Sequence, residues 1–267
     1  MISKSGQSAK LLRSCYDDID LDQSDRPAFA VRLDFNDYEA EVPQHQHKEG
    51  QLILALHGAV TCKTENGIWI VPPDCGVWIP GGVPHSNQVT SNARLSYLFV
   101  QPGAATLPHE CCTLSVSPML REMILRLADV PVNSPPDNHV GRMVQVLLDE
   151  LAQMPMQGLD LPASSHPKIA AITAALMAEP SDRRTLVDWA THVAMSERSL
   201  KRLMVQETGL TFGRWRRQLH LVIALRELAS GATVQRVSSD LGYESPTAFI
   251  VMFKKALGTT PTRYFAR

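Results

Sequence analysis

The spacing of apolar residues changes once along this 267-residue chain, and that change limits the possible folds more than any other feature. From about Phe29 to Val100, short apolar runs alternate with turn signals, a texture typical of an all-β domain. After Pro118 the apolar residues recur at the spacing of helices. The pattern therefore predicts an α+β multidomain protein, with an all-β domain first and an all-α domain last.

Short strands joined by tight turns are expected in the first part. The predicted strands are residues 29–33, 51–56, 59–64, 68–71 and 94–100. Asn66 and Gly67 stand between two of these runs, and both residues tolerate the positive φ of a type I′ turn. We therefore expect a two-residue hairpin turn at this dipeptide.

Two helices are expected between residues 119 and 151, separated by a Pro-rich loop at 131–137. Residues 154–167 contain three prolines and two serines, which is the composition of a linker. The rest of the chain is predicted as a separate helical domain.

The two parts differ strongly in charge. Before His166 the chain has 11 Lys+Arg against 19 Asp+Glu, and from His166 onward it has 15 against 8. The parts therefore carry formal charges of −8 and +7. This asymmetry indicates that the basic part binds a polyanion and that the acidic part has another task.

Several other classes of protein do not fit the sequence. The N-terminus has no apolar run suited to a signal peptide, and no stretch approaches the roughly 18 apolar residues of a membrane span. We expect a cytoplasmic protein without a membrane partner. The chain has an odd number of cysteines and no CxxC pair, which argues against a disulfide framework; they are Cys15, Cys62, Cys75, Cys111 and Cys112.

Residues 185–209 predict a helix, a tight turn and a second helix. Thr185 and Asp188 have the spacing of a capping box, so a short helix begins there. Ser196 is placed to cap the next helix, which ends before Gly209. This is the arrangement of a helix-turn-helix unit, whose second helix enters the major groove of DNA.

The same arrangement recurs after one long helix, predicted at 212–229. Residues 234–240 form the first helix of the second unit, 241–243 its turn, and Ser245 caps a helix that reaches about Leu257. Two such units joined by one helix are much more specific than either unit alone. The long helix also carries outward arginines, which either contact DNA or form a solvated face; these are Arg214, Arg216 and Arg217.

These residues resemble the AraC/XylS family of transcription regulators. The match consists of the run 238–245 and of Phe249, Phe253, Lys254, Lys255, Gly258, Thr260, Pro261 and Tyr264, with Ser196, Leu200, Arg202 and Gly209 in the first unit. The resemblance implies a seven-helix domain over 168–267. Its two recognition helices are expected to enter successive major grooves of double-stranded DNA, about 34 Å apart.

The resemblance also implies which side chains face the DNA. The base-facing residues of the first recognition helix would be Glu197, Arg198, Lys201 and Arg202, and those of the second Pro246, Thr247, Ile250 and Val251. Lys254 and Lys255 are candidates for phosphate contacts. Because Ile250 and Val251 offer only apolar contact, for instance to thymine methyl groups, we expect the first helix to carry most hydrogen-bonded specificity. The alternative is that these two residues belong to the core.

His45-Gln46-His47 and the segment 80–87 resemble the two cupin motifs, over about residues 27–105. This resemblance implies that the first domain is a cupin-like β-barrel. The chain is thereby similar to the cupin-containing AraC subgroup that includes a regulator of 2-nitroimidazole resistance. In cupins such histidines and a Glu hold a divalent metal, which here implies His45, His47, Glu49 and His85. The Glu usually stands four or five residues after the second His, where this chain has Gln51. The alternative is a pocket for an organic effector, lined by His45, His47, Gln51, Trp69, Trp78 and His85.

Taken together, these features predict an effector-responsive DNA-binding regulator rather than an enzyme. Its expected parts are an N-terminal segment (1–26), an effector-sensing cupin-like domain (27–110), a helical dimerisation segment (111–153), a linker (154–167) and the DNA-binding domain (168–267). Expected partners are a second copy of the chain, held through Leu120, Ile124, Leu147 and Leu151, a small-molecule effector, and RNA polymerase. The target is expected to be an efflux transporter gene or a metabolic gene. The alternatives are a cupin metalloenzyme with an accessory helical domain and a DNA-binding protein that needs no effector.

Overall fold

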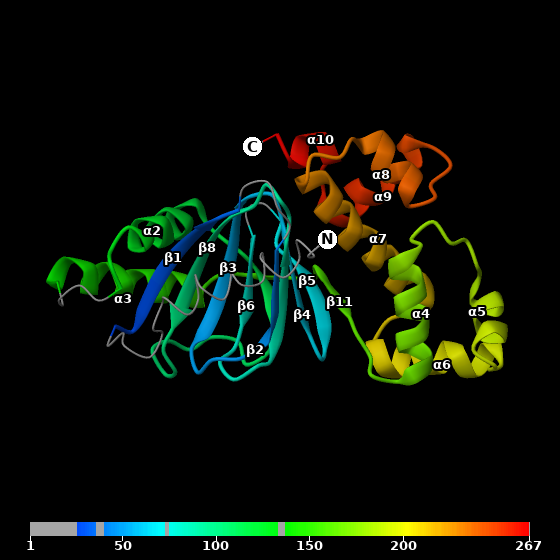
Figure 1. Cartoon of the computed structure of the whole chain (residues 1–267), viewed down its shortest axis with the longest axis horizontal. Helices are drawn as coiled ribbons and strands as arrows, with labels where there is room; N and C mark the ends of the chain where they lie inside the picture. Colours follow the sequence, from blue (N-terminus) through cyan, green and yellow to red (C-terminus); the bar gives the residue numbers. More distant parts are fainter. Residues whose placement is uncertain (1–25, 36–39, 73–74, 133–136, 267) are drawn as a thin grey trace, which may run out of the picture. The chain divides into compact units, whose positions relative to one another are not determined.

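The computed structural model describes residues 26–35, 40–72, 75–132 and 137–266 (Figure 1). The chain divides into two compact units between Gly158 and Leu159, and the short segment Glu65–Ile68 groups with the second unit. This division falls inside the segment predicted as a linker. Most of the predicted N-terminal segment, with Cys15, and the centre of the Pro-rich loop lie outside the described residues.

The described strands form two sheets, and all of them except β11 belong wholly or partly to the first unit. One sheet has the strand order β1-β8-β3-β6-β9-β10 and the other the order β11-β5-β4-β7-β2. The strands are β1 (Ala28–Asp34), β2 (Ala40–His45), β3 (Gly50–His57), β4 (Val60–Thr64), β5 (Gly67–Ile70), β6 (Cys75–Ile79), β7 (His85–Val89), β8 (Arg94–Val100), β9 (Cys112–Ser115), β10 (Met156–Gln157) and β11 (Asp160–Pro162). The described strands thus form two separate sheets, and the predicted β-barrel is not closed.

Side chains that alternate along the strands build two distinct cores. Between the sheets, Ile53 of β3 and Tyr97 of β8 pack with Cys62 of β4 and Val89 of β7. On the opposite face of the first sheet, alternate residues such as Leu52 pack against helices. This alternation follows from the two-residue period of a strand, and it gives the space between the sheets an apolar lining.

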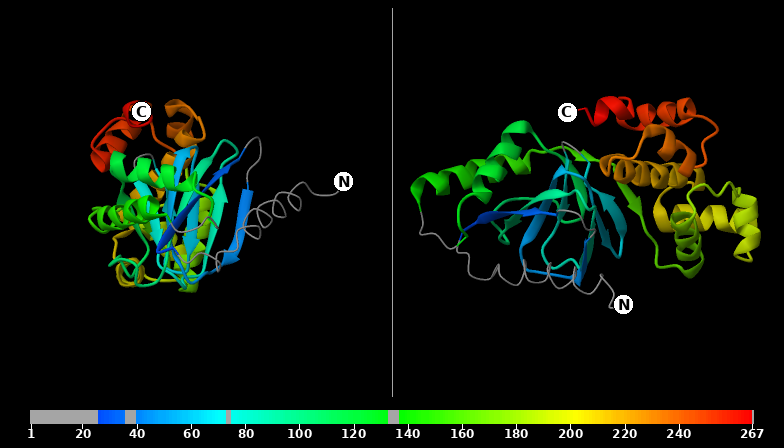
Figure 2. Two further views of the ribbon diagram at one scale, coloured as in Figure 1. Left: turned by 90° about the vertical axis from the view of Figure 1, so that its left-hand side faces the viewer. Right: turned by 45° about the horizontal axis from the view of Figure 1, so that its top comes forward.

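The helices α2 (Pro118–Ala128) and α3 (Asn138–Ala152) pack together on the outer face of the first sheet, as all three views show (Figures 1 and 2). The four leucine and isoleucine side chains predicted to form a dimer interface are instead at most 1% exposed and belong to this core; they are Leu120, Ile124, Leu147 and Leu151. The prediction that these four side chains form a dimer interface is therefore wrong, because they already pack against the sheet within one chain. The outward face of this helix pair carries Met119, 51% exposed, and Val146, 48% exposed.

The hairpin between β4 and β5 differs in detail from the prediction. Because β4 ends at Thr64 and β5 begins at Gly67, the two turn residues are Glu65 and Asn66. Neither Asn66 nor Gly67 has a positive φ. The dipeptide signal therefore located the hairpin correctly, but the predicted type I′ turn at residues 66–67 was wrong.

The second unit contains seven helices among its described residues, as expected for residues 168–267. They are α4 (Pro167–Ala178), α5 (Leu186–His192), α6 (Glu197–Thr208), α7 (Phe212–Ala229), α8 (Val234–Asp240), α9 (Pro246–Leu257) and α10 (Pro261–Tyr264). Within the part of the chain that the structure describes, no helix is both long enough and apolar enough to span a membrane.

Candidate DNA-binding face and effector site

Matched capping residues set the two candidate recognition helices, α6 and α9. The hydroxyl of Ser196 accepts a hydrogen bond from the backbone N–H of Ser199, and Ser245 does the same for Ala248. Both helices end at a glycine in the left-handed conformation, Gly209 in α6 and Gly258 in α9. The sequence therefore fixes both helices at both ends by the same means.

The turn before each recognition helix is also repeated. In the first helix-turn-helix unit the N–H of Met195 donates to the carbonyl of Ala190. In the second helix-turn-helix unit the N–H of Tyr243 donates to the carbonyl of Ser238. Each turn needs one residue with positive φ: Ala194 at 51° and Gly242 at 73°. These bonds hold α5 against α6 and α8 against α9, which is the geometry of two helix-turn-helix units.

One face of α6 is anchored in the core and the other is exposed. Leu200 and Met204 are completely buried. All four predicted base-facing residues of this helix lie exposed on the other side; they are Glu197, Arg198, Lys201 and Arg202. Arg can donate two hydrogen bonds to a guanine edge, so this exposed stripe has the chemistry of direct base readout.

The helix α9 presents a less polar stripe at equivalent positions. Phe249 and Phe253 are completely buried and hold the helix on the core. Val251 is 62% exposed, so the reading of Val251 as a core residue does not hold, whereas Ile250 is half-buried. The remaining predicted contact residues are exposed, namely Pro246, Thr247, Lys254 and Lys255.

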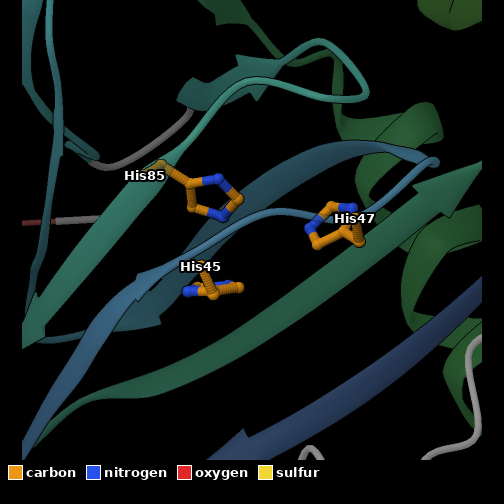
Figure 3. A group of neighbouring side chains, drawn as sticks. All are labelled: His45, His47 and His85. Atoms are coloured by element: carbon orange, nitrogen blue, oxygen red, sulfur yellow. The ribbon is translucent and has the colours of Figure 1, made fainter.

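Three histidines converge between the sheets of the first unit (Figure 3). His45 ends β2, His47 follows it and His85 begins β7, whose residue 85 pairs with residue 45. One ring nitrogen of each histidine lies within 4.8 Å of one in each of the other two. The segments that the sequence singled out thus meet in one place.

Backbone carbonyls determine which ring nitrogen carries the proton in all three imidazoles. The Nδ1 atoms of His45, His47 and His85 lie 2.8–2.9 Å from the carbonyl oxygens of Pro43, Glu49 and Val83, respectively. A carbonyl oxygen only accepts hydrogen bonds, so each Nδ1 carries the proton. In neutral rings the lone pair is then on Nε2, which is how metal-binding histidines are oriented in proteins.

Burial favours the neutral form of two of these rings, those of His47 and His85. It lowers the pKa of His47, and the carbonyl of Glu49 only partly opposes this effect. Burial also lowers the pKa of His85 to about 4, and the neighbouring His45 and His47 add to the shift. Neutral imidazole is the form that ligates a divalent metal, so the donor set fits such an ion.

Gln51 and Glu49 differ in their relation to the cluster. Oε1 of Gln51 lies 3.0 Å from Nε2 of His85. Because this nitrogen carries a lone pair, the contact needs either the amide N–H in place of the oxygen or a cation that both atoms bind side by side. Glu49 is 1% exposed, and its carboxylate lies 3.8 Å from Nζ of Lys48 rather than within the histidine group.

The two tryptophans predicted to line the pocket lie on different faces. Trp69 of β5 belongs to the core between the sheets, and no hydrogen-bond partner of its Nε1 is found among the described residues. Trp78 belongs to the helix-facing core, where its Nε1 donates to the carbonyl of Pro108. The structure therefore brings Trp69, but not Trp78, into the core that contains the histidines.

Sequence reasoning missed Asn87. This residue follows His85 by two positions on β7 and is 1% exposed, and its Nδ2 and Oδ1 have no hydrogen-bond partner among the described residues. A buried amide without partners costs free energy, so a ligand or water is expected beside it. The two-residue period from His85 would have identified it.

These geometries agree with the comparison with known proteins. Residues 29–167 match the model of the AraC-like ligand binding domain, and residues 189–267 match that of a helix-turn-helix domain. The chain belongs to the AraC family and is a helix-turn-helix transcription regulator with an N-terminal ligand-binding domain.

Among curated proteins, the chain is 56% identical over 229 residues to the HTH-type transcriptional regulator NimR of Escherichia coli (strain K12), covering 86% of this chain and 84% of that protein. Among solved structures, it is similar to ToxT from Vibrio cholerae O395 (TM-score 0.38, 10% identity, 89% of this chain and 95% of that one). It is also similar to the DNA-binding domain of AdpA in complex with a target DNA (TM-score 0.36, 27% identity, 38% of this chain and 92% of that one).

Proposed function

We propose that the chain binds a specific operator through both helix-turn-helix units, with α6 as the main reader of bases. The observation that carries this proposal is the exposed stripe of α6, which is formed by Arg198, Lys201 and Arg202. The helix itself is capped at both ends. The helix α9 would contribute apolar contact through Val251 and phosphate contact through Lys254 and Lys255. Guanidinium pairs bases bidentately, whereas Val contacts only a thymine methyl group.

Binding to a genomic operator fragment, measured by fluorescence anisotropy, tests this division of roles. Arg198→Ala is expected to weaken operator binding and to reduce the preference over random DNA. Lys254→Ala is expected to weaken binding to both DNAs alike and to lower the salt dependence. The reverse pattern, with Lys254 carrying the sequence preference, would contradict the proposal.

We infer that the space between the sheets holds the effector, beside a divalent metal at the three histidines. The unpartnered amide of Asn87 and the indole N–H of Trp69 support a polar small molecule there. The shared orientation of His45, His47 and His85 supports the metal, with Gln51 as an oxygen donor beside them. The metal would supply a positive charge to which an effector atom binds.

Metal content of the purified full-length protein, measured after dialysis against excess Zn²⁺ or Ni²⁺ and then buffer, tests the site. We expect about one ion per chain in the wild type and in His57→Ala, a matched control. His57 also donates from Nδ1 to a backbone carbonyl, that of Asn92, but lies outside the cluster. Stoichiometric metal in His85→Ala, or none in the wild type, would refute the metal and leave the pocket for an organic effector.

A homodimer and contact with RNA polymerase complete the proposed function, with an efflux transporter gene or a metabolic gene as the target. The outward face of α2 and α3, with Met119 and Val146, supports the dimer because exposed apolar side chains favour association. Light scattering is expected to give a dimer for the wild type and a monomer for Val146→Glu. We also infer that the chain is not an enzyme, which the regulator names of its curated relatives support.

A further inference from the structure

A hollow of about 280 Å³ lies in the second unit, between α7 and the turn that joins α8 to α9. One wall consists of Gly213, Arg216, Arg217 and His220, whose spacing places them on the same face of α7. The other wall is Leu241, Gly242 and Tyr243. None of these residues belongs to the predicted base-reading stripes.

The charge of this hollow is positive. Two guanidinium groups line it, and no carboxylate does. The nearby carboxylate of Asp182 accepts a hydrogen bond of 2.7 Å from Arg184, and that of Glu244 lies 3.9 Å from Arg183. No carboxylate among the described residues pairs with Arg217.

Backbone contacts hold the walls of the hollow in place. Gly242 has a φ of 73°, and a Cβ there would lie 2.9 Å from the carbonyl oxygen of Ser181, so the turn fits tightly against residue 181. Arg183 donates to the carbonyl of Gly242 at 2.8 Å. Across the hollow, Nδ1 of His220 lies 3.2 Å from the hydroxyl of Tyr243. At the rim, Gly213 leaves space because it has no side chain.

We propose that this hollow binds one phosphate group between Arg216, Arg217 and the hydroxyl of Tyr243. Guanidinium matches the oxygens of phosphate with two parallel hydrogen bonds, and a tyrosine hydroxyl donates a third. The phosphate comes either from the DNA backbone or from a free molecule in solution. Because the walls belong to the connecting helix and to the second helix-turn-helix unit, a bound phosphate stabilises the orientation of α9 relative to α7.

Thermal unfolding of the full-length protein tests binding without DNA. Inorganic phosphate is compared with chloride at equal ionic strength for the wild type, Arg217→Gln and the control Arg214→Gln. Arg214 is an exposed arginine of the same helix that does not line the hollow. If the site takes free phosphate, the wild type and the control gain about 2 °C or more in Tm, and Arg217→Gln gains nothing.

The salt dependence of DNA affinity tests whether the phosphate in the hollow belongs to the DNA backbone. If the phosphate belongs to the DNA backbone, Arg217→Gln lowers the slope of log K against log salt concentration by about one, and Arg214→Gln leaves it unchanged. Either result supports a phosphate site at Arg217. The proposal is overturned if phosphate gives the wild type no extra stability while the slope of Arg217→Gln is unchanged, or if both variants change alike. Sequence-specific DNA binding that persists in that case leaves the proposed function intact.

Discussion

Replacing Val251 by Ala is expected to weaken operator binding while leaving the fold stable. The side chain is 62% exposed on α9, so it contributes little to the core and is free to be covered by DNA. Val→Ala removes two carbon groups, worth about 0.8 kcal/mol each when fully buried. Scaled by the exposed fraction, the loss is about 1 kcal/mol, which corresponds to roughly a fivefold rise in Kd.

Fluorescence anisotropy with a labelled operator fragment gives the Kd, and thermal unfolding of the free protein gives the stability. Val187→Ala is the matched control, because Val187 is 52% exposed on α5, outside both recognition helices. We expect this control to bind as the wild type does. An unchanged Kd for Val251→Ala, or an equal loss in the control, would refute the assignment of Val251 to the DNA face. A lower Tm for Val251→Ala would show that the residue acts through the fold.

Three further predictions concern the same unit. Arg202→Ala is expected to lose about 1 to 3 kcal/mol of operator binding in the same assay, and unchanged affinity would contradict its role as a base reader. Ala194→Gly is expected to stabilise the protein by about 0.5 to 1 kcal/mol in urea unfolding, because Ala194 has a φ of 51°; a loss of stability would contradict strain at this turn. Burial lowers the pKa of His220 to about 4, and Arg216 adds to the shift, so its folded pKa lies below the ordinary value of about 6.5. The unfolded state then binds more protons, and from pH 7 to pH 5 the wild type is expected to lose about 2 kcal/mol more stability than His220→Gln; equal losses would contradict this.

The second unit was largely predictable because its signals are local. A capping hydroxyl, a left-handed glycine and an apolar stripe act within one or two turns of a helix. Thr185, Ser196 and Ser245 therefore mark helix starts that the structure confirms. Gly209 likewise marks the confirmed end of α6.

The first unit was less predictable because its details depend on contacts distant in sequence. The apolar spacing identified α2 and α3, but an apolar stripe does not tell whether it meets a sheet or a second chain. Leu147 is therefore buried within the unit rather than in a predicted dimer interface. Trp78 points to the helix side for a similar reason, since the face of a strand residue follows from the register of the whole sheet.

The candidate effector site was predicted in part. The two histidine motifs were visible in the sequence, and the pairing of β2 with β7 brings them together. The tautomers were not visible, since they depend on the backbone carbonyls of Pro43, Glu49 and Val83. Asn87 is the last residue of the second cupin-like segment but was not predicted to line the pocket, because only its burial without partners makes it notable.

Selection of bound genomic DNA fragments with the purified full-length protein, followed by footprinting on the most enriched one, tests whether the chain reads one operator with both helix-turn-helix units. We expect a specific site with two protected major-groove segments about one helical turn apart for each chain, and we expect Arg202→Ala and Val251→Ala to lose part of this protection. Fragments enriched without a common sequence, or a site with one protected segment that neither substitution changes, would contradict this expectation.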